Sequence, residues 1–352
     1  MPTMPRPTPR GPLTEELLTV VRDRPHRLPG LTRSAQRAVN AASDVLADDD
    51  VQLALTVLYE LHHQGLAGTD DGWEWSPDLI AARSVLEQPV EQALRDAVRE
   101  RLDRAGVPTA ADDVPAALFA LVAEDDGPSL SGYLARTATA DQFREFLVHR
   151  SLYHLKEADP HTWAIPRLAG RAKAALVEIQ ADEYGGGRPE RMHAALFATA
   201  MRGAGVDGRY GAHVDAVPAV TLAWANAVVL LGLHRRLRGA VAGHLAALEM
   251  TSSVPNRLYA RGVRRLGLPA ETAWFFDEHV EADAVHEQIA AHDLAGGLAE
   301  AEPALVPDLF LGAAIALHTD ARVAEHLLGR WTQGRSALRD PAREAAQLAV
   351  PA

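Results

Sequence analysis

The sequence predicts an all-α protein, folded as a helical bundle. Apolar residues recur at the three-to-four-residue spacing of amphipathic helices along most of the chain, and no run of alternating β-branched residues is long enough to indicate a strand. The composition agrees with this prediction. Of the 352 residues 47% are hydrophobic but only 5% are aromatic, which favours helices that pack through small side chains.

The first part of the chain is expected to hold a tail and a set of helices. Residues 1–12 contain prolines and basic residues but no apolar stretch of the kind found in a signal peptide, so they predict a disordered tail. Residues 13–125 follow as an N-terminal helical region that ends at a helix-breaking Asp-Asp-Gly-Pro run. Its expected helices span residues 13–22, 33–47, 51–63, 77–83, 90–105 and 114–123.

Residues 126–352 are expected to form the main bundle. Its helices are delimited by proline and glycine: the helix at 166–184 has a proline near its start and three glycines just after its end. Pro160 is expected to break the chain and Pro255 to end a helix. The expected helices span residues 130–138, 140–155, 166–184, 189–203, 218–232, 237–251, 255–266, 269–298 and 307–331.

Composition and charge exclude several classes of protein. The chain has no cysteine, which rules out disulfides, cysteine-ligated zinc, iron–sulfur clusters and thiol nucleophiles. The formal charge of −12 and the lack of a basic stripe argue against nucleic-acid binding. The longest apolar stretch, residues 216–233, is interrupted by Pro218, Asn226 and Gly232, so no membrane span and a cytoplasmic protein are expected.

The most informative stretch is residues 278–286, which contain His279, Asp283 and His286. At 100° per residue these three side chains point in nearly the same direction from a helix, at about 0°, 40° and 340°. Two imidazoles and a carboxylate on one helix face suit a divalent metal that prefers nitrogen and oxygen ligands. The alternative is an exposed, charged helix face.

Three further residues continue apolar stripes and are candidate ligands. Glu183 follows Ile179 by one helical turn, and Glu249 ends a stripe of its own helix. A carboxylate on a core-facing stripe is costly unless it is paired, protonated or bound to metal. His193 also shares a face with apolar residues. Alternatives stay open for each: a solvent-exposed helix end for Glu183, a satisfied core histidine for His193, and a carboxylate capped by hydroxyls or an arginine for Glu249.

These residues together resemble the haem-oxygenase-like di-iron oxidases and oxygenases, the iron-containing redox enzymes. That family has ligands in the order Glu, His, Glu and then His-x3-Asp-x2-His on one late helix. The chain fills all six positions in that order, and residues 178–185 (Glu-Ile-Gln-Ala-Asp-Glu-Tyr-Gly) and 249–253 (Glu-Met-Thr-Ser-Ser) are also similar to the family's motifs. The likeness is strongest over residues 156–286. It implies a haem-oxygenase-like bundle with an N-terminal helical extension.

The resemblance also implies the chemistry. The metal ligands would be Glu183, His193, Glu249, His279, Asp283 and His286, with Glu183, Glu249 and Asp283 as the catalytic carboxylates and Glu249 as the expected bridge. Two Fe(II) ions, or manganese or a mixed pair, would activate O2 as co-substrate to oxidise a small amino acid or amine. Electrons would come from an external donor, because the chain carries no flavin or iron–sulfur motif. The sequence is also compatible with a homodimer.

Four other classes of protein compete with this interpretation. A ferritin-like di-iron protein would use Glu190-x-x-His193 and Asp283-x-x-His286, but it leaves His279 without a role. A fatty-acid decarboxylase of the same fold and a metal-free helical binding protein are further alternatives. A haem oxygenase proper has no use for the acidic residues.

Several residues near the motifs have an open role. Glu157 is interpreted as a helix-terminal charge before a proline turn, in preference to a substrate contact. Arg202, Arg257 and Arg261 are candidate clamps for a substrate carboxylate, against ordinary surface ion pairs. The glycine run at 185–187, between Glu183 and His193, predicts that one metal site is labile.

Overall fold

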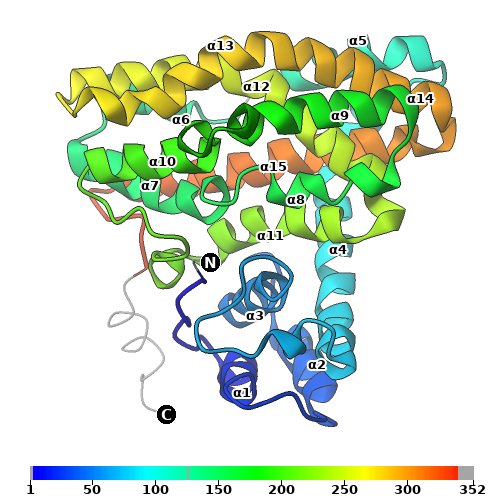
Figure 1. The fold of residues 1–352 in the computed structure, drawn as a ribbon, viewed down its shortest axis with the longest axis vertical. Coiled ribbons are helices and arrows are strands. Elements are labelled where there is room, and N and C mark those ends of the chain that lie inside the picture. The colour runs from blue at the N-terminus through cyan, green and yellow to red at the C-terminus, as the bar shows by residue number, and fades with distance from the viewer. Residues whose placement is uncertain (1–2, 125–126, 340–352) are drawn as a thin grey trace.

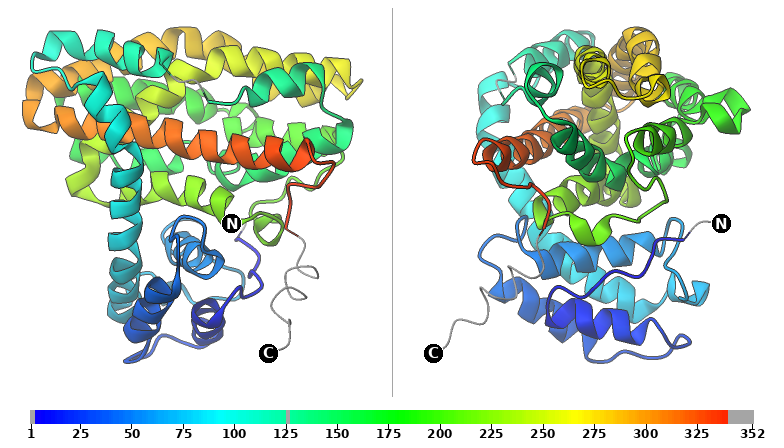
Figure 2. Two further views of the ribbon diagram at one scale, coloured as in Figure 1. Left: turned by 180° about the vertical axis from the view of Figure 1, so that it is seen from behind. Right: turned by 90° about the vertical axis from the view of Figure 1, so that its left-hand side faces the viewer.

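The computed structural model describes residues 3–124 and 127–339, and nearly all regular structure within them is helical. The helices form two tiers (Figure 1). The lower tier consists of three N-terminal helices and the start of a long upright helix that enters the upper tier (Figure 2). These helices are α1 (Pro12–Val20), α2 (Leu31–Ala41), α3 (Asp49–Glu60) and the upright α4 (Pro77–Ala105).

The upper tier is a bundle of long helices. Its first members are α5 (Val114–Ala123), α6 (Leu130–Arg136), α7 (Ala140–His154), α8 (Asp159–Thr162), α9 (Gly170–Glu183) and α10 (His193–Gly203). They are followed by α11 (Ala219–Leu233), α12 (Arg238–Arg265), α13 (Trp274–Gln288), α14 (Gly297–Ala301) and α15 (Val306–Trp331). A π-helical segment, Ile289–Gly296, joins α13 to α14. The predicted all-α bundle is therefore confirmed.

The expected disordered tail is wrong for residues 3–12. Met4 is only 2% exposed and forms a parallel bridge with Leu66. Arg10 donates one hydrogen bond to Asp49 of α3 and another to the carbonyl of Val214, both of 2.6 Å. The segment is ordered because Met4 and Arg10 find partners that are distant in sequence, which its proline-rich composition does not reveal. Residues 1 and 2 lie outside the described part of the chain.

α4 continues through Pro89, where the sequence predicts a break between residues 83 and 90. A proline inside a helix removes one backbone donor and crowds the preceding turn. The helix persists because its buried residues on both sides of the proline, including Leu86 and Val90, pack against neighbouring helices. Tertiary packing thus outweighs the local cost.

α12 likewise continues through Pro255, where the sequence predicts a helix end. One turn earlier, the hydroxyl of Thr251 donates to the carbonyl of Ala247 at 2.7 Å, and that of Ser252 donates to the carbonyl of Glu249 at 3.2 Å. These hydroxyls contact the backbone of a helix that a proline would otherwise weaken.

The backbones of α12 and α15 touch where the two helices cross. A Cβ on Gly243 of α12 would overlap the carbonyl oxygen of Leu309, and a Cβ on Gly312 of α15 would overlap the carbonyl oxygen of Ala240. Glycine is therefore required at both positions. This crossing sets the distance between the two longest helices of the upper tier.

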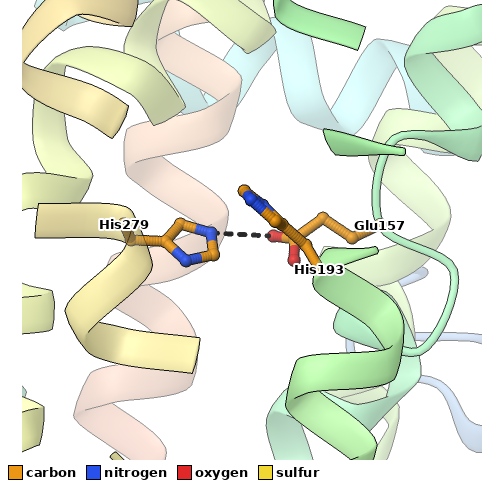
Figure 3. A group of neighbouring side chains, drawn as sticks. All are labelled: Glu157, His193 and His279. Carbon is orange, nitrogen blue, oxygen red and sulfur yellow. Dashed lines mark ion pairs between the residues drawn. The ribbon is translucent and has the colours of Figure 1, made fainter. Parts of the chain in front are cut away.

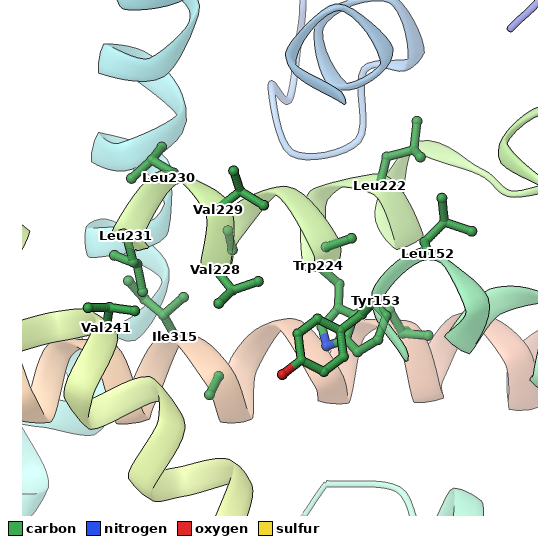
Figure 4. Packing of buried hydrophobic residues seen from close by; sticks show 14 of the residues in the cluster. Leu152, Tyr153, Leu222, Trp224, Val228, Val229, Leu230, Leu231, Val241 and Ile315 are labelled. Atoms are coloured by element: carbon green, nitrogen blue, oxygen red, sulfur yellow. The ribbon is translucent and has the colours of Figure 1, made fainter. Parts of the chain in front are cut away.

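The two tiers meet along α11, whose residues are apolar on nearly every face and almost all buried (Figure 4). The buried polar residues of α11 are Thr221 and Asn226, and Asn226 contacts the lower tier. Its amide donates to the side-chain oxygen of Gln52 in α3 at 2.9 Å and accepts a hydrogen bond of 3.1 Å from Thr56. Asn226, which interrupts the apolar stretch of the sequence, therefore links the two tiers by hydrogen bonds.

The predicted boundary between residues 13–125 and 126–352 does not separate two sets of helices, because helices from the two sides pack against each other. α4 packs against both α2 and α15, and α5 packs against α12, α15 and the π-helical segment. Residues 125 and 126 themselves lie outside the described part. One helical stretch, Pro303–Trp331, is long and apolar enough to cross a membrane, but 67% of its apolar window is buried inside the protein, as expected for a core helix.

Candidate metal centre

The structure brings five of the six predicted ligands together at the centre of the upper tier, from four helices. Glu183 is the last residue of α9, and His193 is the first residue of α10. Glu249 lies in the middle of α12, and α13 carries His279 and His286. The sixth predicted ligand, Asp283, is also in α13, but its side chain lies outside the described residues.

The first group of side chains consists of Glu157, His193 and His279 (Figure 3). One ligand atom from each lies within 4.8 Å of the other two. The Nε2 atom of His279 is 3.9 Å from Oε1 of Glu157, and the two imidazole rings have centroids 4.3 Å apart. The Nδ1 atom of His279 lies 2.7 Å from the carbonyl oxygen of Phe275. Because that contact needs a proton on Nδ1, Nε2 keeps its lone pair for a metal.

Glu157 is a member that the sequence interpretation placed elsewhere, as a helix-terminal charge. It lies in the turn between α7 and α8, next to Ala158, whose φ of 75° is the one positive value at a non-glycine residue among the described residues. Its Oε1 atom is 2.7 Å from Nδ1 of His154, and its side chain is 9% exposed. A local proline turn carries no signal that it faces two distant histidines, so only the fold reveals this role.

The second group consists of Glu183, Glu249 and His286, all buried, with ligand atoms again within 4.8 Å of one another. The Nδ1 atom of His286 is 3.5 Å from Oε2 of Glu249. Its Nε2 atom is 3.0 Å from Oδ2 of Asp182, the residue before Glu183. A carboxylate on the far nitrogen fixes the ring and leaves the other nitrogen for a metal.

The two groups differ in electrostatics. Burial and the neighbouring His193 hold the pKa of His279 well below its usual value, so this imidazole is neutral. Burial alone would lower the pKa of His286 too, but contacts with Glu249 and Asp182 outweigh it and raise the pKa to about 9. Burial also raises the pKa of Glu249. Without metal, His286 is therefore cationic between its acidic neighbours.

The groups adjoin through Glu183. Its Oε2 atom lies 2.9 Å from Nδ1 of His193, a member of the first group. Glu183 thus contacts both groups, a position that the sequence interpretation assigned to Glu249. The loop between these two residues turns through Gly185, Gly186 and Gly187, which all have positive φ. A Cβ on Gly185 would lie 2.6 Å from the backbone nitrogen of Met192, so this loop folds tightly back on itself.

Other candidates from the sequence lie outside the two groups. Glu190, which a ferritin-like template would use, is exposed in the loop before α10. Arg202, Arg257 and Arg261 are exposed and do not line the central cavity.

The side chains fit a pair of metal ions. The Oε2 atom of Glu157 is buried and accepts no hydrogen bond from the described residues. A buried carboxylate oxygen is costly without a donor or a cation, and a metal ion held by this group would be such a partner. Imidazole nitrogens and carboxylate oxygens without any thiolate are the donor set that iron and manganese favour.

A cavity of about 390 Å³ opens onto these groups, and its wall includes Glu157, Glu183, Glu249 and His279. The same wall carries a charge pair, in which the guanidinium of the buried Arg150 donates to the carboxylate of the partly exposed Asp320. That guanidinium also lies 4.9 Å from the ring centroid of Trp224. The volume suits a small organic molecule.

Comparison with known proteins gives one family. No curated protein matches the chain at a significant level. The model of the family described as iron-containing redox enzymes matches residues 144–321, about half of the chain. The match begins in α7 and ends in α15, so it contains every member of both groups. The chain therefore belongs to the haem-oxygenase-like family of iron-containing redox enzymes.

Proposed function

We propose that this protein is a non-haem di-iron oxidoreductase that uses O2 to oxidise a small amino acid or amine. The observation that carries the proposal is the pair of adjoining groups of buried histidines and carboxylates at the wall of one cavity. Membership of an iron-containing redox family supports it.

Each group would hold one ion. Glu157, His193 and His279 would bind the first, and Glu183, Glu249 and His286 the second. Glu183 would be the ligand nearest to both sites, because it is the carboxylate that also contacts His193. With Asp283 as the remaining ligand inferred from the sequence, the carboxylates of Glu157, Glu183, Glu249 and Asp283 would balance the charge of two divalent ions.

The iron pair would supply the electrons that reduce O2, and the protein would position the substrate. His279 and His286 are oriented by Phe275 and Asp182 through the nitrogens that do not face the groups. The cavity would place the reacting group beside Glu157 and His279, which line its wall. The electrons for further turnovers would come from an external donor.

The charged part of the cavity wall supports an amino acid or amine as substrate. Arg150 offers a cationic site to a carboxylate, and Asp320 offers an anionic site to an ammonium or guanidinium group. Facing a fatty acyl chain, the partly exposed Asp320 carboxylate would lose solvent and gain no partner beyond Arg150. This weighs against the alternative of a fatty-acid decarboxylase.

Anaerobic reconstitution tests the proposal. Metal-stripped protein is loaded with Fe(II), the bound iron is counted, and O2 consumption is followed with a panel of amino acids, amines and fatty acids. We expect two irons per chain and O2 consumption that a cationic amino acid or amine accelerates. His279→Ala should lose iron, whereas the exposed Arg202→Ala should keep it. A wild-type protein that binds no iron would contradict the proposal.

A further inference from the structure

The turn that carries Glu157 is tied to the N-terminal tier by a buried ion pair. The Nζ atom of Lys156 lies 3.2 Å from Oε2 of Glu60, the last residue of α3. Lys156 is 8% exposed and Glu60 is 1% exposed. A buried ion pair with both partners present is tolerated, but removing one partner leaves an uncompensated charge in the interior.

Glu60 is itself held on several sides. Its Oε1 atom accepts a hydrogen bond of 2.6 Å from the hydroxyl of Tyr210 and one of 3.2 Å from the backbone of Gln64. Its carbonyl accepts hydrogen bonds from the backbone nitrogens of His63 and Gly65, both of 3.0 Å. The carboxylate that receives Lys156 is therefore rigidly placed.

Lys156 and Glu157 are neighbours that face opposite ways. Lys156 contacts the lower tier, whereas Glu157 contacts His154 and approaches His279 in the upper tier. The next residue, Ala158, has a backbone conformation that L-residues rarely adopt. Its carbonyl accepts a hydrogen bond of 2.9 Å from Gln180 of α9. A strained turn persists only where its surroundings hold it, and the ion pair is one of these restraints.

We propose that Glu60 is a positioning residue for the metal site of Glu157, His193 and His279, acting through Lys156. The inference rests on the proposed function, since it presupposes that this group binds a metal. It gives the N-terminal tier a role, because Glu60 lies outside residues 144–321 that match the family. The lower tier then completes one of the two metal sites.

The test uses full-length, metal-stripped protein and Mn(II) as the probe. Calorimetric titration gives the number and affinities of bound ions, and electron paramagnetic resonance distinguishes coupled ion pairs from single ions. Glu60→Gln keeps the shape of the side chain but removes its charge. Glu87→Gln is the matched control, because Glu87 is also a buried acid of the N-terminal half and pairs with His234 at 2.9 Å, away from the turn.

We expect wild-type protein and Glu87→Gln to bind two Mn(II) ions and show a coupled pair. Glu60→Gln should bind one ion with unchanged affinity and the other at least about tenfold more weakly, with loss of the coupled signal. A purely structural role would lower both affinities together, which overturns the proposal. Two ions bound as in the wild type would overturn it as well.

Tyr210→Phe serves as the milder variant, because it removes one hydrogen bond to Glu60 and leaves the ion pair intact. We expect a smaller loss of affinity at the same site. If Glu60→Gln does not fold, unchanged binding of both ions by Tyr210→Phe overturns the proposal. A wild-type protein that binds no Mn(II) instead overturns the proposed function, before any variant is compared.

Discussion

The Nε2 atom of His286 lies 3.0 Å from Oδ2 of Asp182, the residue directly before Glu183. α9 thus contributes two consecutive carboxylates with different roles. Glu183 is buried among the candidate ligands, whereas Asp182 supports the back of an imidazole from α13. The contact between Asp182 and His286 holds the imidazole ring in one orientation.

Asp182→Asn should weaken metal binding without removing a ligand. The change removes an anion that helps to raise the pKa of His286 and makes the imidazole a poorer donor to metal. We expect affinity for one ion to fall about tenfold, the low end of the range for such partners, because the Asp182 side chain is 62% exposed. Titration with Mn(II) measures this. Glu178→Gln, an exposed acid one turn earlier, is the control, and equal affinities in the two variants would refute the role of Asp182.

Gly185→Ala should disrupt the connection between Glu183 and His193. A methyl group there would lie 2.6 Å from the backbone nitrogen of Met192, so the loop must shift and His193 with it. Gly187→Ala is the matched control, since Gly187 also has positive φ but has no atom within 4 Å of the added methyl.

Both of these glycine variants should lose about 1 kcal/mol of stability from backbone strain. Only Gly185→Ala should also lose affinity for one metal ion, as calorimetric titration would show. Weaker binding at a single site would agree with the expectation that this break makes one site labile. Identical metal binding in the two variants would show that the loop does not control His193.

The protein should lose stability steeply in acid. Burial lowers the pKa of His149 to about 3 and that of His63 to about 3, and it lowers the pKa of His244 to about 4. In the unfolded chain these groups bind protons near pH 6.5, so the unfolded state takes up more protons below that pH. Each contributes stability at neutral pH that is lost as the pH falls from 6.5 toward its folded pKa, by at most about 1.4 kcal/mol per pH unit.

Urea unfolding at pH 7.5 and pH 5.0 measures this loss. His149→Gln should reduce the difference between the two free energies of unfolding, because glutamine does not titrate and can still contact the hydroxyl of Thr221, which lies 2.7 Å from Nδ1 of His149. The exposed His26→Gln should leave the difference unchanged. An equal difference in wild type and His149→Gln would contradict the argument.

Alanine at the crossing of α12 and α15 should be strongly destabilising. Gly243→Ala and Gly312→Ala each place a methyl group into a carbonyl of the facing helix, where backbone must move. We expect losses above about 3 kcal/mol, the upper range for overpacking. Gly329→Ala, further along α15 with open space around the added methyl, should be neutral or stabilising by about 0.5–1 kcal/mol. Thermal unfolding of the three variants decides between these outcomes.

Helical periodicity predicted the all-α class and most of the helices, because amphipathic spacing is a local property. It failed at Pro89 and Pro255, where buried residues on both sides hold a helix that the proline alone would break. It also failed for residues 3–12, since the partners of Met4 and Arg10 are distant in sequence. Such contacts are invisible to any local pattern.

The candidate site was predictable where ligands follow helical spacing or continue an apolar stripe, as for His279, His286, Glu183 and Glu249. Glu157 was not, because it lies in a turn and approaches His279 only through the fold. Arg150 was missed for a similar reason: a basic residue in a mixed helix gives no sign that it lines a cavity. The arginines singled out from the sequence are instead exposed.

The contact between α12 and α15 has a consequence for how the cavity can change in evolution. α12 carries Glu249 and α15 carries Asp320, so a candidate metal ligand and a charged residue of the cavity wall lie on two helices whose backbones are already in contact. No side chain larger than glycine fits between them. The cavity is therefore reshaped more readily by replacing the side chains that line it, such as those of α6 and α7, than by changing the spacing of α12 and α15. Members of the family with different substrates would then share the spacing of α12 and α15 and differ in the side chains that line the cavity.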